Sequence, residues 1–162
     1  MLDDIAALSN IDDMLAYFER PDIIARLRQR DPLNSARIRG LRRMVELLGA
    51  EDGVCTAEQF ARISDLEPKD VEQRRNQGQL LGFRISPSDW AYPIWQTGPD
   101  GLLPGLSSVM AEEPDESAWG WMAFFLAPNV WLDGARPLDV LRQGDIERVR
   151  NAARLIGEQV AA

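Results

Sequence analysis

Apolar residues recur at spacings of three and four along much of this 162-residue chain, and proline or glycine repeatedly interrupts the pattern. Such spacing places apolar side chains on one face of an α-helix, and proline and glycine mark where helices end. The first segment shows the pattern at Ile5, Leu8, Ile11, Leu15 and Phe18, and Pro21 follows it. The sequence therefore predicts a mainly α, multi-helix fold.

Further helices are predicted from the same pattern and its end signals. A helix is expected over 22–30, and Asp31-Pro32 ends it because a residue before proline is pushed out of helical geometry. The next helix is expected over 34–48, with Gly49 as its stop signal. Four more are expected in the second half of the chain, at 106–110, 118–125, 138–142 and 145–159.

The middle of the chain carries signals for two consecutive helices. Thr56 and Gln59 are spaced as a capping box, which satisfies the free N–H groups at a helix start. Ser64-Asp65 is expected to turn the chain. Pro68 suits the first turn of the second helix, and Gly78 is expected to end it.

A small β-hairpin is predicted directly after these helices. The runs 80–85 and 90–94 have strand character, and the turn-rich tetrapeptide 86–89 separates them. Two short helices joined by a tight turn and followed by a hairpin are typical of a winged helix-turn-helix, whose second helix enters the DNA major groove. The predicted organisation is a helical segment at 1–50, a helix-turn-helix-like module with its hairpin, or wing, at 51–97, and a helical C-terminal domain at 98–162.

The second helix of this module carries side chains that suit DNA. Arginine pairs with guanine, asparagine and glutamine pair with adenine, and lysine contacts phosphate. The candidate DNA-binding residues are Lys69, Gln73, Arg74, Arg75 and Asn76. The alternative is that they form the solvated face of a surface helix, because Glu67, Asp70 and Glu72 lie among them.

Positive charge is concentrated near the N-terminal end. Eight arginines fall between Arg20 and Arg43, opposed only by Asp22 and Asp31, whereas residues 85–162 carry eleven acidic residues against five arginines. Any nucleic-acid contact is therefore expected in the first half of the chain. Arginines at helical spacing are also typical of ion pairs within and between helices, and this alternative stays open.

The composition argues against catalysis. The chain has no histidine, one cysteine and a formal charge of −8, so the commonest general base and the commonest metal ligand types are absent or nearly so. Phosphate-cradling, dinucleotide and common hydrolase motifs are absent as well. We expect no enzyme activity, no cofactor and no metal, and we interpret carboxylate pairs such as Glu112-Glu113 as solvated charge.

The same features predict a cytoplasmic protein without a membrane anchor. A single cysteine, Cys55, excludes an internal disulfide and fits a reducing compartment. The chain begins with an acidic stretch where a secretory signal would be basic, and its apolar runs fall well short of the roughly 20 residues of a membrane span.

Aromatic residues cluster in the C-terminal third. Trp119, Trp121, Phe124, Phe125 and Trp131 fall within thirteen residues. That is more than one helix of a small domain must bury, so part of this stripe is expected to form an interface. Packing in the core is the alternative.

From Tyr92 onward the sequence resembles the toxin-binding domain of the Xre/MbcA/ParS type of bacterial antitoxin. The stretches that carry the resemblance are YPIWQ at 92–96, LPGL at 103–106, Trp119, FLAPN at 125–129 and LDGARPLDVLRQGD at 132–145. The resemblance implies a domain that dimerises and holds a toxin enzyme inactive, often beside a separate DNA-binding part that represses its own operon. The candidate partner-binding residues are Trp119, Trp131, Arg136, Pro137, Leu138 and Arg142.

Two functional hypotheses follow. The first is an antitoxin-like regulator, a homodimer that binds its own operator DNA and a protein partner, and it predicts an exposed, positive second helix. The second is a protein-only adaptor or toxin neutraliser without DNA binding, and it predicts that Arg74 and Arg75 are paired with nearby acids.

Overall fold

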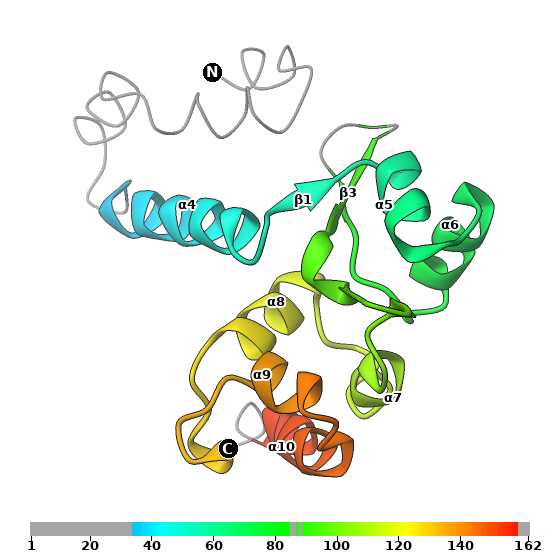
Figure 1. The fold of residues 1–162 in the computed structure, drawn as a ribbon. Helices are drawn as coiled ribbons and strands as arrows, with labels where there is room; N and C mark the ends of the chain where they lie inside the picture. The colour runs from blue at the N-terminus through cyan, green and yellow to red at the C-terminus, as the bar shows by residue number, and fades with distance from the viewer. Residues whose placement is uncertain (1–33, 85–86, 88, 159–162) are drawn as a thin grey trace.

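Helices dominate the part of the chain that the computed structural model describes, residues 34–84, 87 and 89–158 (Figure 1). The predicted mainly α character is confirmed, with a small antiparallel sheet beside the helices. The α-helices are α4 (Asn34–Gly49), α5 (Ala57–Ser64), α6 (Pro68–Asn76), α7 (Leu106–Met110), α8 (Ala118–Leu126), α9 (Pro137–Arg142) and α10 (Ile146–Glu158). The helices predicted over 5–18 and 22–30 lie outside the described residues.

Helix α4 ends in an unusual turn. Its last residues Leu47 and Leu48 are buried against the core. Glu51, Asp52 and Gly53 then take positive φ angles of 53°, 69° and 79°, a region that non-glycine residues adopt at a cost. This turn delivers the chain from α4 into the first strand.

The main sheet has three short antiparallel strands in the order β1–β3–β2. They are β1 (Val54–Cys55), β2 (Phe83–Arg84) and β3 (Trp90–Pro93). Cys55 lies opposite Tyr92, and Arg84 lies opposite Trp90. The central strand is thus the last of the three in sequence, and it holds the other two together.

Helices α5 and α6 form where their local signals predict them. The Thr56 hydroxyl accepts a hydrogen bond from the Gln59 N–H at 3.3 Å, and the Gln59 side chain accepts one from the Thr56 N–H at 2.9 Å, which completes the capping box. Asp65 ends α5 at a φ of 56°, and Pro68 opens α6. The ring of Phe60 lies 5.5 Å from that of Tyr92, so α5 is fixed to β3.

A buried glutamine connects the sheet to the segment that follows. Gln96 lies in the 3₁₀ helix η1 (Ile94–Gln96) and is fully buried. Its Oε1 accepts from the Leu81 N–H at 2.7 Å, and its Nε2 donates to the carbonyls of Leu81 at 3.0 Å and Pro93 at 3.2 Å. The strands β4 (Thr97–Gly98) and β5 (Gly101–Leu102) then pair across a tight turn.

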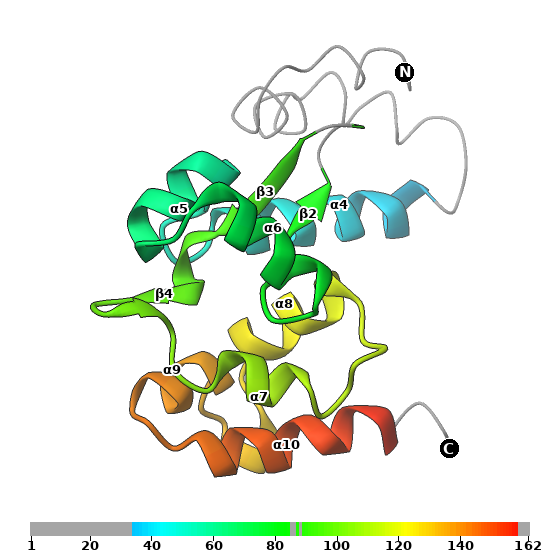
Figure 2. The same cartoon turned by 90° about the vertical axis from the view of Figure 1, so that its right-hand side faces the viewer.

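The C-terminal helices form a layer below the sheet. In both views α8 lies between the sheet and the helices α9 and α10 (Figures 1 and 2). Trp95 contacts Phe125 at 5.2 Å between ring centroids, and Phe83 contacts Trp119 at 4.4 Å. One continuous cluster of buried side chains therefore spans the boundary predicted near 97–101, and the three-segment division remains a prediction.

Candidate binding surfaces

Four of the five predicted DNA-binding residues lie at or near the surface of α6. Lys69, Gln73 and Asn76 are exposed, and Arg74 is half-buried. Lys69 Nζ lies 2.7 Å from Glu67 Oε2. Within the described residues no ion pair involves Arg74.

Arg75 occupies a different environment. Its side chain is only 11% exposed, and its guanidinium carbon lies 3.8 Å from the centre of the Trp90 ring. One nitrogen donates to the Tyr92 hydroxyl at 3.0 Å and another to Asn76 Oδ1 at 2.9 Å. Arg75 therefore connects the end of α6 to strand β3.

The charge around α6 is mixed rather than strongly positive. The helix carries Lys69, Arg74 and Arg75 against Asp70 and Glu72. Across 51–97 there are five basic and eight acidic residues. The exposed arginines Arg39, Arg42 and Arg43 lie instead on α4, and Arg43 pairs with Glu46 at 3.4 Å.

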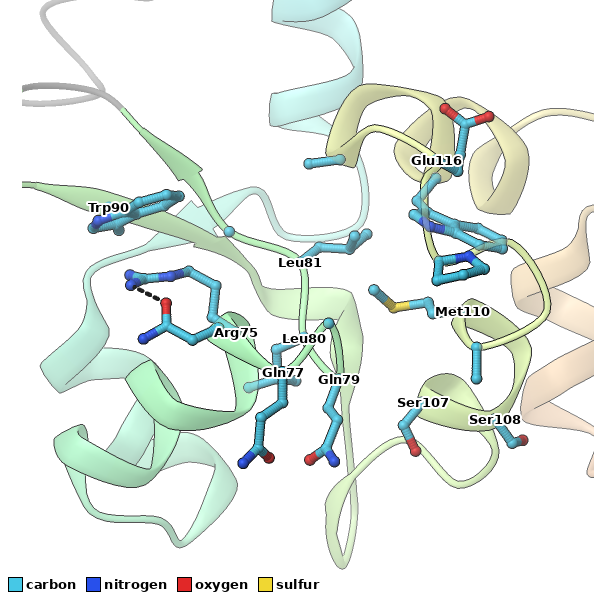
Figure 3. Close-up of a pocket in the computed structure, with 17 residues that line it drawn as sticks. Arg75, Gln77, Gln79, Leu80, Leu81, Trp90, Ser107, Ser108, Met110 and Glu116 are labelled. Carbon is cyan, nitrogen blue, oxygen red and sulfur yellow. Dashed lines mark hydrogen bonds between the residues drawn. The ribbon is translucent and has the colours of Figure 1, made fainter.

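An open groove of about 850 Å³ lies between the end of α6 and the helices α7 and α8 (Figure 3). Figure 3 shows Arg75 beside Trp90 on one side of it, and Met110 and Glu116 on the other. The residues along its floor are nearly buried and expose little apolar surface: Leu80, Leu81, Met110 and Trp121. Glu116 already accepts hydrogen bonds from the backbone N–H and the hydroxyl of Ser117.

The described residues offer neither a metal-binding cluster nor a reactive thiol. No cluster of three or more candidate metal ligands occurs among them. Cys55 is buried, its thiol donates to the Tyr92 carbonyl at 3.6 Å, and burial raises the pKa of the thiol to about 11. A thiol held protonated in this way is a poor nucleophile.

The most exposed large apolar side chains form a pair between α8 and α9. Val130 is 79% exposed and Trp131 is 54% exposed, whereas their neighbour Leu132 is buried. The loop is held by Asn129, whose Oδ1 accepts from the Trp131 N–H at 2.8 Å and whose carbonyl accepts from the Gly134 N–H at 2.9 Å. A rigid turn thus presents an indole to solvent.

Arg136 precedes helix α9, Arg142 is its last residue, and both bind Glu51. Arg136 lies 2.8 Å from one Glu51 oxygen, and Arg142 lies 2.8 Å from the other. Arg136 also donates two hydrogen bonds of 2.7 Å to Asp139. The hydrogen bonds from Arg142 and Arg136 lower the pKa of Glu51, and that from Arg136 lowers the pKa of Asp139.

Of the three remaining predicted partner-binding residues, two are buried and one is half-buried. Pro137 is buried as the first residue of α9, and Leu138 is fully buried. Trp119 is half-buried against Phe83. Helix α9 packs against α8 and α10, and of this group Trp131 offers the largest free apolar surface.

Helix α7 is tied to α10 by an ion-pair cluster at Glu112. Its side chain is only 13% exposed, and it accepts hydrogen bonds of 2.6 Å from both Arg150 and Arg154. These bonds, chiefly the one from Arg154, lower the pKa of Glu112. The expectation of solvated charge was therefore wrong for this residue, since α10 supplies two cations from 38 and 42 residues further along the chain.

Sequence reasoning did not single out Glu51 or Gln96. Glu51 follows the glycine stop of α4 and looks like an ordinary turn residue. Gln96 belongs to the YPIWQ stretch, and a polar residue directly after an apolar run was the one signal that could have indicated a buried hydrogen-bonding role.

Within the described residues no helix combines the length and the apolar character needed to cross a bilayer. Comparison of the sequence with models of known protein families found no match. Comparisons with curated proteins and with solved structures found no significant match either.

Proposed function

We propose that this chain is a non-catalytic, antitoxin-like regulator that binds a protein partner through its C-terminal region and DNA through the unit formed by α5, α6 and the sheet. The resemblance of residues 92–145 to antitoxin toxin-binding domains supports a toxin enzyme as the partner. Each of the two binding activities rests on one structural observation.

The observation that carries partner binding is the exposed pair Val130 and Trp131. Large aromatic side chains are enriched at the centre of protein interfaces because they bury much area at a small entropic cost. Trp131 lies on a turn fixed by Asn129, so little conformational freedom is lost on binding. Arg136 and Arg142 already bind Glu51. They therefore hold α9 against the turn after α4 and are not free to contact the partner.

The observation that carries DNA binding is the arrangement of α5 and α6 beside the antiparallel pair β2 and β3. The order of two short helices followed by a strand pair is that of a winged helix-turn-helix. The outer face of α6 presents Gln73 and Arg74, which suit base edges and phosphate. In a homodimer, two such helices would meet two half-sites of an operator.

A protein-only adaptor is the second candidate, and the surroundings of Arg75 favour it. Arg75 is engaged by Trp90, Tyr92 and Asn76 instead of facing solvent. The excess of acid over 51–97 also opposes attraction to phosphate. In this reading α5 and α6 serve as a packing unit.

DNA binding is tested by titrating the full chain against a labelled fragment of its own upstream DNA from about 50 to 200 mM salt. We expect specific binding, and the change Arg74→Gln should reduce the slope of log affinity against log salt by about 1. Arg148→Gln on α10 is the matched control and should leave the slope unchanged. Absence of binding at the lowest salt would leave the protein-only adaptor.

Partner binding is tested by co-expression with the product of the adjacent gene and by measuring the affinity of the purified pair. Trp131→Ala should weaken binding by at least about tenfold, because a central aromatic contributes roughly 2 kcal/mol or more. Gln143→Ala, at the exposed residue that follows α9, should not change it. Equal affinity of wild type and Trp131→Ala would reject this surface.

A further inference from the structure

We infer that Arg75 is a positioning residue of the proposed DNA-binding unit, which fixes the end of α6 against β3 and does not itself contact DNA. The inference rests on the proposed DNA binding and concerns how that site is held. From the sequence alone, Arg75 is a candidate for direct contact with DNA bases or phosphates. We assign it instead the role of holding α6 in place.

The first line of support is the engagement of the guanidinium. It stacks on the Trp90 ring at 3.8 Å and donates to the Tyr92 hydroxyl and to Asn76 Oδ1. Only arginine can stack a planar group on a ring and donate hydrogen bonds in that same plane, since the lysine ammonium is not planar. With the side chain 11% exposed, contact with a phosphate would require these interactions to break.

The second line of support is the backbone beside Arg75. A Cβ added at Gly82 would lie 2.8 Å from Arg75 Cδ and 3.2 Å from the Tyr92 ring. The stem of Arg75 therefore runs directly over the bare backbone of Gly82, in the link between α6 and β2. The Arg75 side chain thus contacts α6, the link to β2 and strand β3. Because it contacts all three, it can set the angle between the helix and the strand pair.

Orientation matters here because base contacts require the helix and the strand pair to reach one duplex together. A site held about 1 Å too loosely loses function even when all its contacting residues are present. Loosening α6 should reduce specific affinity, whereas attraction to any DNA, which depends on the number of phosphates neutralised, should persist.

The test uses two variants that disturb the packing of Arg75 by different routes. Arg75→Met removes the guanidinium, and Gly82→Ala keeps it but displaces it from Trp90. We expect both to weaken binding to the chain's own upstream DNA by at least about fivefold, with non-specific affinity and the salt slope unchanged. A direct phosphate contact predicts a different result, because Arg75→Met would then lower the salt slope by about 1.

A double-mutant cycle with Trp90→Leu separates positioning from general instability. If Arg75 acts through Trp90, adding Arg75→Met to Trp90→Leu should cost little further affinity. Additive losses would overturn the inference. All variants are compared at a temperature well below their melting points, so that unfolded protein does not enter the measured affinity.

Hydrogen exchange gives a readout that does not depend on DNA. Amides in the last turn of α6 and in 79–84 should exchange at least about tenfold faster in Arg75→Met than in wild type, with α10 unchanged. Unchanged protection would overturn the inference. If wild-type protein binds no DNA, the proposed DNA binding fails, and this measurement alone decides whether Arg75 fixes α6.

Discussion

The carboxamide of Gln96 pairs with the backbone of Leu81 as a neighbouring strand would. Its oxygen accepts from the Leu81 N–H at 2.7 Å, and its nitrogen donates to the Leu81 carbonyl at 3.0 Å. Both residues are buried, where an unpaired polar group is expensive. A single side chain thereby satisfies the backbone that connects α6 to β2.

The first prediction concerns this pair. Gln96→Leu keeps most of the volume but leaves the N–H and C=O of Leu81 without partners, and we expect a loss of about 2–4 kcal/mol in the free energy of unfolding. Urea titration at 25 °C measures it. Gln143→Leu, at an exposed position, should change stability by less than about 0.5 kcal/mol, and equal effects of the two changes would contradict the assigned role.

The second prediction is a pH dependence centred on Glu51. Hydrogen bonds from Arg142 and Arg136 lower the pKa of Glu51 in the folded state. A carboxyl group with a lowered folded pKa contributes stability above its unfolded pKa, and this contribution is lost as pH falls through the folded value. Wild type should therefore be more stable than Glu51→Gln near neutral pH, and the difference should shrink on acidification below about pH 4.5. A difference that stayed constant down to about pH 3 would show that the ion pairs contribute nothing.

The third prediction uses the single cysteine of the chain. Burial raises the pKa of the Cys55 thiol to about 11, so both its thiolate fraction and its accessibility are low. At about pH 8, iodoacetamide should modify the folded protein at least about a hundredfold more slowly than the urea-unfolded protein. Because Cys55 is the only cysteine, mass spectrometry follows it directly. Comparable rates in the two states would be incompatible with its position under Tyr92.

The fourth prediction compares two glycines with similar backbone angles. Gly105 has a φ of 83° and Gly134 a φ of 81°, but a Cβ at Gly105 would lie 2.7 Å from the Ile146 side chain, whereas one at Gly134 meets nothing within 4 Å. Gly134→Ala should lower the free energy of unfolding by about 1–2 kcal/mol, because alanine is strained at this backbone angle. Gly105→Ala should cost about 1–3 kcal/mol more, since it also overpacks the contact between α7 and α10. Thermal unfolding of both variants checks the order.

Elements with strong local signals could be predicted from the sequence. The helix expected over 34–48 is Asn34–Gly49, that over 106–110 is Leu106–Met110, and the capping box at Thr56 forms as expected. Cap residues, proline and glycine act within a few residues of themselves, so their effect does not depend on the rest of the fold.

Features that depend on distant partners could not be predicted. Strand β1 has two residues and is defined only by pairing with β3, 37 residues further along. Leu138 was a candidate for partner binding because of the family resemblance, and only the packing of α9 in the fold reveals that it is fully buried. Arg75 has a side chain that suits contact with DNA. Its packing against Trp90 depends on the tertiary structure, so the sequence could not indicate it.

The ion pair between Glu51 and Arg142 joins residues 91 positions apart. During synthesis α4, the sheet and α8 leave the ribosome before α9, and domains fold as their residues emerge. The pair between Glu51 and Arg142 can therefore form only after α9 has been synthesised, so the turn after α4 gains its contacts with α9 late, when most of the described fold is already in place.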